Sequence, residues 1–192
     1  MADVFVFHHA QGLTPGVTAF ADALRAEGHA VRTPDLYEGR TFDTLEAGLD
    51  HAERTGFDEL LDRGVRSAAQ APADVVHIGF SLGVLPAQKL AQTRPGARGA
   101  VLVHSCVPVP AFGTWPAGLP VQVHAMEADR LFTDEGDADA ARALAAEVPE
   151  AELHLYPGDR HLFADSSLPS YEAGAAALLL DRTIAFLRSL DA

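Results

Sequence analysis

The chain has 192 residues, of which 48% are hydrophobic and 21% charged, a composition typical of a folded protein and unlike that of a disordered one. This length predicts one compact domain over residues 1–192. Lys and Arg number 14 against 27 Asp and Glu, and the net charge of −13 repels nucleic-acid phosphates and anionic membranes. We therefore expect neither nucleic acid nor membrane as a partner.

The sequence also carries no signal for export or membrane insertion. No apolar run reaches the ~18 residues that a membrane helix needs, and the first eight residues lack the basic start of a signal peptide. Cys106 is the only cysteine, so no intrachain disulfide can form. These features fit the reducing cytosol, and we expect a cytoplasmic protein whose oligomeric state the sequence does not indicate.

Short apolar runs alternate with amphipathic stretches along the chain, which is typical of a parallel sheet flanked by helices. The runs are rich in Val, Ile, Leu and Phe with little polar alternation, as in strands covered on both faces. The fold class we expect is therefore α/β, with a mainly parallel sheet and helices on both faces. The predicted strands are Asp3–His8, Ala30–Pro34, Asp74–Gly79, Gly99–His104, Val121–Ala125 and Glu152–Tyr156.

Four stretches show helical spacing or helix-ending signals. In the last of them, a stripe of Leu180, Ile184 and Leu187 is expected to be buried. Asp137 is the expected N-cap of the third. Residues 37–55 are compatible with either a small cap or a long loop. The predicted helices cover residues 57–68, 82–93, 138–147 and 173–190.

Gly79-Phe80-Ser81-Leu82-Gly83 is a G-x-S-x-G motif between a predicted strand and a predicted helix. An abrupt strand-to-helix turn holds its corner residue in a strained conformation and exposes that side chain at the edge of the sheet. The flanking glycines allow the helix to pack closely on the strand. Ser81 is therefore the candidate nucleophile, whereas the motif outside such a context is weak.

A serine hydroxyl needs a base and a group that orients the base, and in this arrangement the chain order is Ser, acid, His. Asp129 follows the strand that ends at Ala125, and His161 follows the strand that ends at Tyr156. We predict Asp129 as the acid and His161 as the base. Glu127 is the rival acid, and Asp159 is disfavoured because it lies only two residues before the base.

The oxyanion of such a site is usually held by two backbone N–H groups, one after the nucleophile and one from the loop after an early strand. The candidates are Leu82 and Ala10, with Gln11 as the alternative in the second loop. His9 is expected near the same pocket or, equally, as a simple strand cap.

The remaining histidines, the acidic run and the single cysteine do not indicate a metal, nucleotide or second catalytic site. His77, His104, His124 and His154 lie in four separate predicted strands without the spacing of metal ligands, so we expect no metal. The acidic run at residues 134–139 lacks the calcium-loop order and fits a helix N-terminus. The sequence contains no nucleotide-binding glycine motif, and no cofactor is expected. Cys106 does not lie in a strand-to-helix turn of the kind expected at Ser81, and we expect it to be a buried, inert thiol.

The chain resembles the dienelactone hydrolase family, a compact branch of the α/β-hydrolase superfamily. The resemblance covers nearly the whole chain: the opening strand with its Gly12 loop, Pro34-Asp35-Leu36-Tyr37, the Gly79–Gly83 elbow, Asp129, and Tyr156-Pro157-Gly158 leading to His161. It implies an α/β-hydrolase fold and hydrolysis of a small-molecule ester or lactone through a covalent acyl-enzyme. By the same resemblance, His9, Gln11, Tyr37 and Arg40 are the candidate substrate-binding residues.

Two departures from the family pattern concern the chemistry. The best-known members have a cysteine nucleophile in a G-x-C-x-G-G motif, whereas this chain has Ser81 in place of the cysteine and Val84 in place of the final glycine. Those members also have a glutamate in the first oxyanion loop, at the position where this chain has His9. Those enzymes also bind a substrate carboxylate through arginines, and Arg40 is the only arginine in a loop expected near the pocket. The prediction is therefore a serine esterase or lactone hydrolase. The alternative is a non-catalytic protein of the same fold that binds a small ligand or a partner.

Overall fold

Six strands form one parallel sheet in the computed structural model, which describes residues 1–190. The strand order is β2-β1-β3-β4-β5-β6, and every neighbouring pair is parallel. All six predicted strands are therefore present. Their bounds are β1 Asp3–Phe7, β2 Ala30–Arg32, β3 Val75–Phe80, β4 Gly99–Val103, β5 Val121–Met126 and β6 Ala151–Tyr156.

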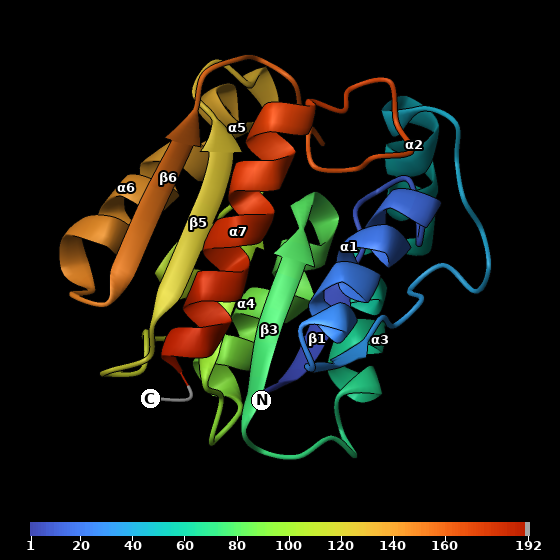
Figure 1. Cartoon of the computed structure of the whole chain (residues 1–192). Coiled ribbons are helices and arrows are strands. Elements are labelled where there is room, and N and C mark those ends of the chain that lie inside the picture. Colours follow the sequence, from blue (N-terminus) through green and yellow to red (C-terminus); the bar gives the residue numbers. More distant parts are fainter. Residues whose placement is uncertain (191–192) are drawn as a thin grey trace.

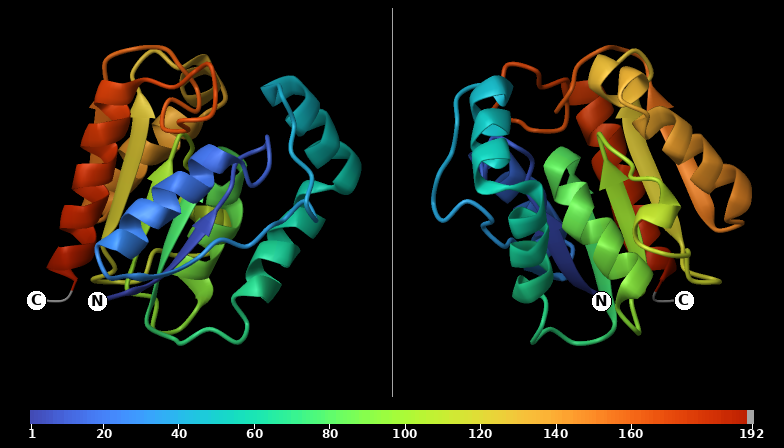
Figure 2. Two further views of the ribbon diagram at one scale, coloured as in Figure 1. Left: turned by 45° about the vertical axis from the view of Figure 1, so that its right-hand side comes forward. Right: turned by 180° about the vertical axis from the view of Figure 1, so that it is seen from behind.

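Helices cover both faces of this sheet, as the sequence predicts. Helices α1 and α7 lie on one face, and Figure 2 shows α3, α4 and α6 on the other. Two short 3-10 turns, η1 and η2, follow β3 and β4. The helices are α1 Pro15–Ala26, α2 Leu45–Thr55, α3 Phe57–Ser67, α4 Val84–Thr93, α5 Arg130–Asp134, α6 Asp137–Glu147 and α7 Ala173–Ser189, and the turns are η1 Ser81–Gly83 and η2 Val109–Ala111.

The central strands are completely buried, because each is covered by apolar side chains on both sides. Every residue of β3, β4 and β5 is buried. One apolar core contains residues of α1 and α7, and a second contains residues of α3, α4 and α6. The three-layer arrangement places the carboxyl ends of all six strands at one edge, near the top in Figure 1, where ligands of open α/β sheets bind.

Several predicted details of the elements are wrong. Strand β2 ends at Arg32 rather than Pro34, in keeping with the missing N–H of proline. The N-cap of α6 is Gly136 in a left-handed conformation, and Asp137 is its first helical residue. In α7, Leu187 is buried as expected, but Leu180 and Ile184 are only half-buried.

Three helices, namely α1, α2 and the short α5, come from stretches in which the sequence does not resolve a helical signal. Helix α1 begins after Thr14, whose side chain accepts a hydrogen bond from the Val17 N–H, and has Pro15 at its first position. Helix α2 occupies the second half of residues 37–55 and begins after a similar threonine cap at Thr44. Figure 2 shows α2 at the level of the carboxyl ends of the strands.

His77 lies in the middle of β3 and makes folding sensitive to acid. Its ring is fully buried, and neither ring nitrogen has a hydrogen-bond partner within residues 1–190. Burial lowers the pKa of His77 from 6.5 to about 3. Below pH 6.5 the unfolded chain therefore binds a proton at this residue that the folded chain does not.

We expect the free energy of unfolding to fall by about 1.4 kcal/mol per pH unit through His77 alone as the pH drops from 6.5 towards 3. His77→Phe and His77→Gln both remove this titrating group. In each variant the free energy of unfolding, measured by urea denaturation, should depend on pH less steeply by about 1.4 kcal/mol per pH unit. Only His77→Phe should also raise stability at pH 7.5, because it removes the unpaired nitrogens. An unchanged slope in both variants would contradict the prediction.

Candidate active site

The G-x-S-x-G motif forms the sharp turn that the sequence predicts. Strand β3 ends at Phe80, the 3-10 turn Ser81–Gly83 follows directly, and α4 begins at Val84. Ser81 has a φ of 48°, which is unusual for a residue with a side chain. The expected role of the glycines is also confirmed, because a Cβ on Gly79 would lie 2.3 Å from the Gly83 carbonyl oxygen, and a Cβ on Gly83 2.3 Å from the Phe7 carbonyl oxygen.

Three predicted residues from separate loops meet at this turn. The Ser81 Oγ lies 2.9 Å from Nε2 of His161, and Nδ1 of His161 lies 2.6 Å from Oδ2 of Asp129. His161 is in the loop after β6, and Asp129 follows β5. The rival acids Glu127 and Asp159 are both exposed, and neither is bonded to His161 in the described part of the chain. Asp129 therefore lies at the position that the sequence assigns to the acid.

Asp129 is held in place by a second hydrogen bond. It is the N-cap of the short helix α5, and its Oδ1 accepts from the Leu131 N–H at 3.1 Å while Oδ2 faces His161. The carboxylate is almost completely buried, with 1% of the residue exposed. One oxygen thus fixes the side chain and the other is left for the imidazole.

His9 does not reach the cavity described below, because it is completely buried and bonded to Asp165. Nε2 of His9 lies 2.7 Å from Oδ2 of Asp165, and the Thr14 hydroxyl donates to the same oxygen. Burial alone would raise the pKa of Asp165, but the bonds from His9, Ser167 and Thr14 lower it to about 2. This pair joins the loop after β1 to the loop that carries His161.

The other candidate substrate-binding residues also lie away from the cavity. Gln11 is buried and donates to the Phe42 carbonyl, and Tyr37 is buried against His8, Phe42 and His51. Arg40 is exposed. The structure therefore brings none of His9, Gln11, Tyr37 and Arg40 to the lining of this cavity.

A cavity of about 260 Å³ opens over Ser81 at the carboxyl edge of the sheet. One part is apolar and comes largely from α2, α3 and α4. Another part is polar and comes from the loops after β4 and β5. The lining residues are Leu45, Leu49, Phe57, Ser81, Leu82, Leu85, His104, Ser105, Val107, Leu131, Glu135, Asp137 and His161.

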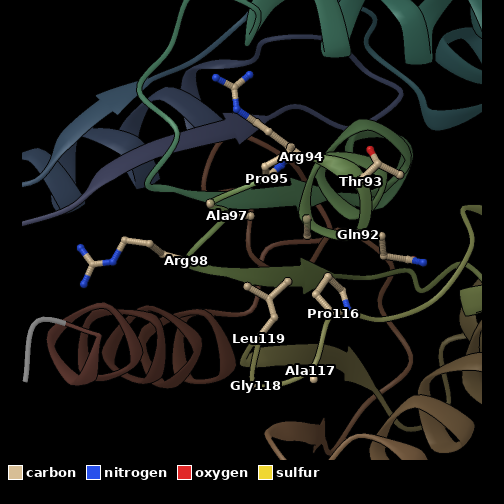
Figure 3. Close-up of a pocket in the computed structure, with 12 residues that line it drawn as sticks. Gln92, Thr93, Arg94, Pro95, Ala97, Arg98, Pro116, Ala117, Gly118 and Leu119 are labelled. Carbon is tan, nitrogen blue, oxygen red and sulfur yellow. The ribbon is translucent and has the colours of Figure 1, made fainter.

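Another cavity, of about 300 Å³, lies at the opposite edge of the sheet and is drawn in Figure 3. It is lined by the end of α4, with Arg94, and by the loops before β4 and β5, with Arg98 and Leu119. The triad of Ser81, His161 and Asp129 is absent from its lining. Because it lies at the amino ends of the strands, we place the candidate active site at the cavity that contains Ser81.

The sequence alone does not indicate the polar residues that line the Ser81 cavity. Asp137 was expected only as a helix cap, but its Oδ2 accepts from the Cys106 N–H at 3.3 Å and its side chain lines the cavity. His104 was expected only as a strand histidine, but it has a φ of 69° and its ring centroid lies 5.5 Å from that of His161. A left-handed non-glycine residue beside the triad is a signal that only coordinates reveal.

Cys106 is buried as expected, and burial raises the pKa of its thiol to about 12, so it is unsuited to be a nucleophile. Within residues 1–190, no group of three or more His, Cys, Asp or Glu side chains is arranged to hold a metal ion. The same described residues include no helix with the length and apolar character needed to cross a membrane.

The sheet topology and the serine at its elbow define a protein of the α/β-hydrolase fold. The sequence profile of the Dienelactone hydrolase family matches residues 2–190, and the chain belongs to this family. Membership of this family indicates a hydrolase. No curated protein gives a significant sequence match.

Solved structures share this fold at low sequence identity. A dienelactone hydrolase-like promiscuous phosphotriesterase, P91, from metagenomic libraries is 21% identical with a TM-score of 0.77, over 99% of this chain and 87% of the other. The protein m3DLH is 23% identical with a TM-score of 0.75, over 98% and 86%. The thermophilic esterase Est2 of Thermogutta terrifontis, solved with propionate, is 16% identical with a TM-score of 0.64, over 98% and 83%.

Proposed function

We propose that this protein is a serine hydrolase that cleaves carboxylic esters or lactones through a covalent acyl-enzyme. The observation that carries the proposal is the continuous path of short contacts from the Ser81 hydroxyl through His161 to Asp129, at 2.9 and 2.6 Å. This path opens into a cavity of about 260 Å³, which is suited to a small substrate. Membership of a hydrolase family supports the same chemistry.

In the first half-reaction the Ser81 hydroxyl donates its proton to Nε2 of His161 as Oγ attacks the ester carbonyl carbon. Asp129 accepts from Nδ1–H of His161, which fixes the tautomer and stabilises the imidazolium. The tetrahedral intermediate collapses when His161 returns the proton to the departing alkoxide. The alcohol leaves, and an ester of Ser81 remains.

In the second half-reaction a water molecule takes the place of the alcohol. His161 removes its proton, hydroxide adds to the acyl carbon, and the bond to the Ser81 oxygen breaks with return of the proton. The acid product is released and the starting enzyme is restored. With a lactone, the ring opens in the first half-reaction and the alcohol stays attached to the acyl chain, so that hydrolysis of the Ser81 ester releases a single hydroxy acid.

The oxyanion is assigned to the backbone N–H groups of Leu82 and Ala10. Leu82 is the second residue of the 3-10 turn and lines the cavity, and the early N–H groups of such a turn have no acceptor inside it. The Ala10 N–H has no hydrogen-bond acceptor within residues 1–190, whereas the Gln11 N–H is bonded to Nδ1 of His9 at 3.2 Å. This difference favours Ala10 over Gln11.

A fluorophosphonate probe tests the nucleophile directly, because attack by an activated oxygen displaces fluoride and leaves a stable phosphonate ester. We expect one adduct per chain by intact mass, mapped by peptide sequencing to Ser81. Ser81→Ala should lose the label, and Ser105→Ala, which removes the other serine of the cavity lining, should retain it. A label on another residue would overturn the assignment of Ser81 as the nucleophile, and no label at all would favour the non-catalytic alternative.

A further inference from the structure

The charged groups of the Ser81 cavity are all acidic apart from the catalytic imidazole. Glu135 and Asp137 line the cavity, and its lining within the described chain includes no lysine or arginine. Arg40, the arginine that the sequence offered for binding a substrate carboxylate, is exposed and lies outside this lining. An anionic substrate would therefore meet two carboxylates and no permanent cation.

Asp137 is the more constrained of the two carboxylates. It is half-buried, and the groups bonded to it are the Cys106 N–H at 3.3 Å and the Ser105 side chain, which are neutral. Burial raises the pKa of Asp137, and the neighbouring Glu135 charge raises it further. The two carboxylates therefore repel each other without a fixed positive partner, which is an arrangement that a cationic ligand would stabilise.

His104 is the remaining titratable residue of the cavity lining, and it carries no charge. Its side chain is 1% exposed, it lines the cavity, and neither ring nitrogen has a hydrogen-bond partner within residues 1–190. Burial lowers the pKa of His104 well below its usual range, so the ring is neutral. It cannot supply the positive charge that would balance Glu135 and Asp137.

The rest of the lining is apolar. Leu45 and Leu49 of α2, Phe57 at the start of α3 and Leu85 of α4 form a hydrocarbon surface in the same cavity as the carboxylates. Such a surface favours an alkyl chain, and the face of an aromatic ring such as Phe57 also attracts alkylammonium groups. The cavity thus combines an apolar part with an anionic part around one nucleophile.

We propose that the substrates of this enzyme are esters that carry a cationic alkylammonium group, which Asp137 and Glu135 recognise, and that esters bearing a carboxylate are rejected. This inference rests on the proposed function, since it concerns the substrate of the Ser81 site. It departs from the carboxylate-bearing lactones that the family resemblance suggests.

Two substrate series test the charge preference at constant shape. The first contains butyryl thioesters of thiocholine, of its uncharged carbon isostere 3,3-dimethylbutanethiol and of 3-mercaptopropionate. The second contains thiophenyl esters of 4-(trimethylammonio)butyrate, 5,5-dimethylhexanoate and glutarate, which place the same charges on the acyl side. In at least one series we expect kcat/KM at pH 8 and low salt to be about tenfold higher for the cation than for the isostere, and lowest for the anion.

Asp137→Asn and Glu135→Gln should each reduce that cation-to-isostere ratio about threefold or more. Asp134→Asn is the matched control, because Asp134 is exposed and lies outside the cavity lining while the substitution removes the same net charge. Asparagine at position 137 keeps an acceptor for the Cys106 N–H, and thermal unfolding checks that each variant is folded. A ratio near one in both series, or one unaffected by either cavity substitution, would overturn the inference.

Failure of the inference and failure of the proposed function give different results. If the neutral esters are cleaved in a Ser81-dependent manner without a charge preference, the inference alone is wrong. If no ester is cleaved, ligand binding tests the charge preference instead. Hexyltrimethylammonium should raise the melting temperature of the wild type more than hexanoate does, and Asp137→Asn should abolish this difference. Equal shifts would overturn the inference in that case as well.

Discussion

Ser81→Ala is expected to lower kcat for a short-chain nitrophenyl ester by about 10⁴- to 10⁶-fold while leaving the protein folded. The hydroxyl lies 2.9 Å from Nε2 of His161, and within residues 1–190 no other serine or cysteine is hydrogen-bonded to this imidazole. Cys106 is buried, and burial raises the pKa of its thiol to about 12. The measurement is kcat for the purified variant beside wild type, and equal activity in the two would remove the basis for the serine mechanism.

Ser81→Gly provides the control for folding. Because Ser81 has a φ of 48°, glycine relieves a conformation that costs an ordinary residue about 1 kcal/mol. We expect this variant to be as inactive as Ser81→Ala and slightly more stable, with a melting temperature about 2–4 °C higher. Loss of activity together with a gain in stability would exclude unfolding as the cause of the loss.

The sheet is predictable from sequence because its strands are buried on both faces. The run Val75–Phe80 is apolar except for His77, and such a run has few alternatives to a central strand. Helix α1 was missed for a local reason. Thr14, Pro15 and Gly16 form a cap and first turn that look equally like an irregular loop, and the helix is secured by packing of Phe20 and Leu24 on the sheet.

The candidate site is also predictable only in part: the three residues in contact at Ser81 could be predicted from the sequence, but the lining of the cavity could not. Ser81, Asp129 and His161 each follow a recognisable strand, and parallel strands bring their carboxyl ends to one edge, so their meeting could be expected from order and spacing. The lining of the cavity could not be derived in this way. Whether Tyr37 faces the substrate or the core depends on how residues 37–55 fold back on the sheet, and it is buried against His51 of α2.

The tie between His9 and Asp165 shows the limit of sequence reasoning most clearly. The two residues are 156 positions apart, and no local pattern indicates that they form a buried pair. The pair becomes intelligible only when the loop after β1 and the loop after β6 are seen to cross the same edge of the sheet. The burial of His9 is thus explained by its contact with Asp165 rather than by contact with a substrate.

Asp129→Asn is expected to lower kcat by about 10⁴-fold at neutral pH, because it reverses the hydrogen bond that fixes the catalytic tautomer. The Asp129 carboxylate accepts from Nδ1–H of His161 and leaves Nε2 free to accept the Ser81 proton. An asparagine amide facing Nδ1 donates instead, which places the imidazole proton on Nε2. In that tautomer His161 cannot act as the base for Ser81.

The same substitution keeps the structural role of this residue, which makes the result interpretable. Asn is as good an N-cap as Asp, and its carbonyl oxygen can accept from the Leu131 N–H as Oδ1 of Asp129 does. We therefore expect an unchanged fold by circular dichroism and nearly unchanged KM. Glu127→Gln is the matched control and should retain full activity, since Glu127 is exposed and has no bond to His161. If Glu127→Gln were inactive and Asp129→Asn active, the acid would have been assigned to the wrong carboxylate.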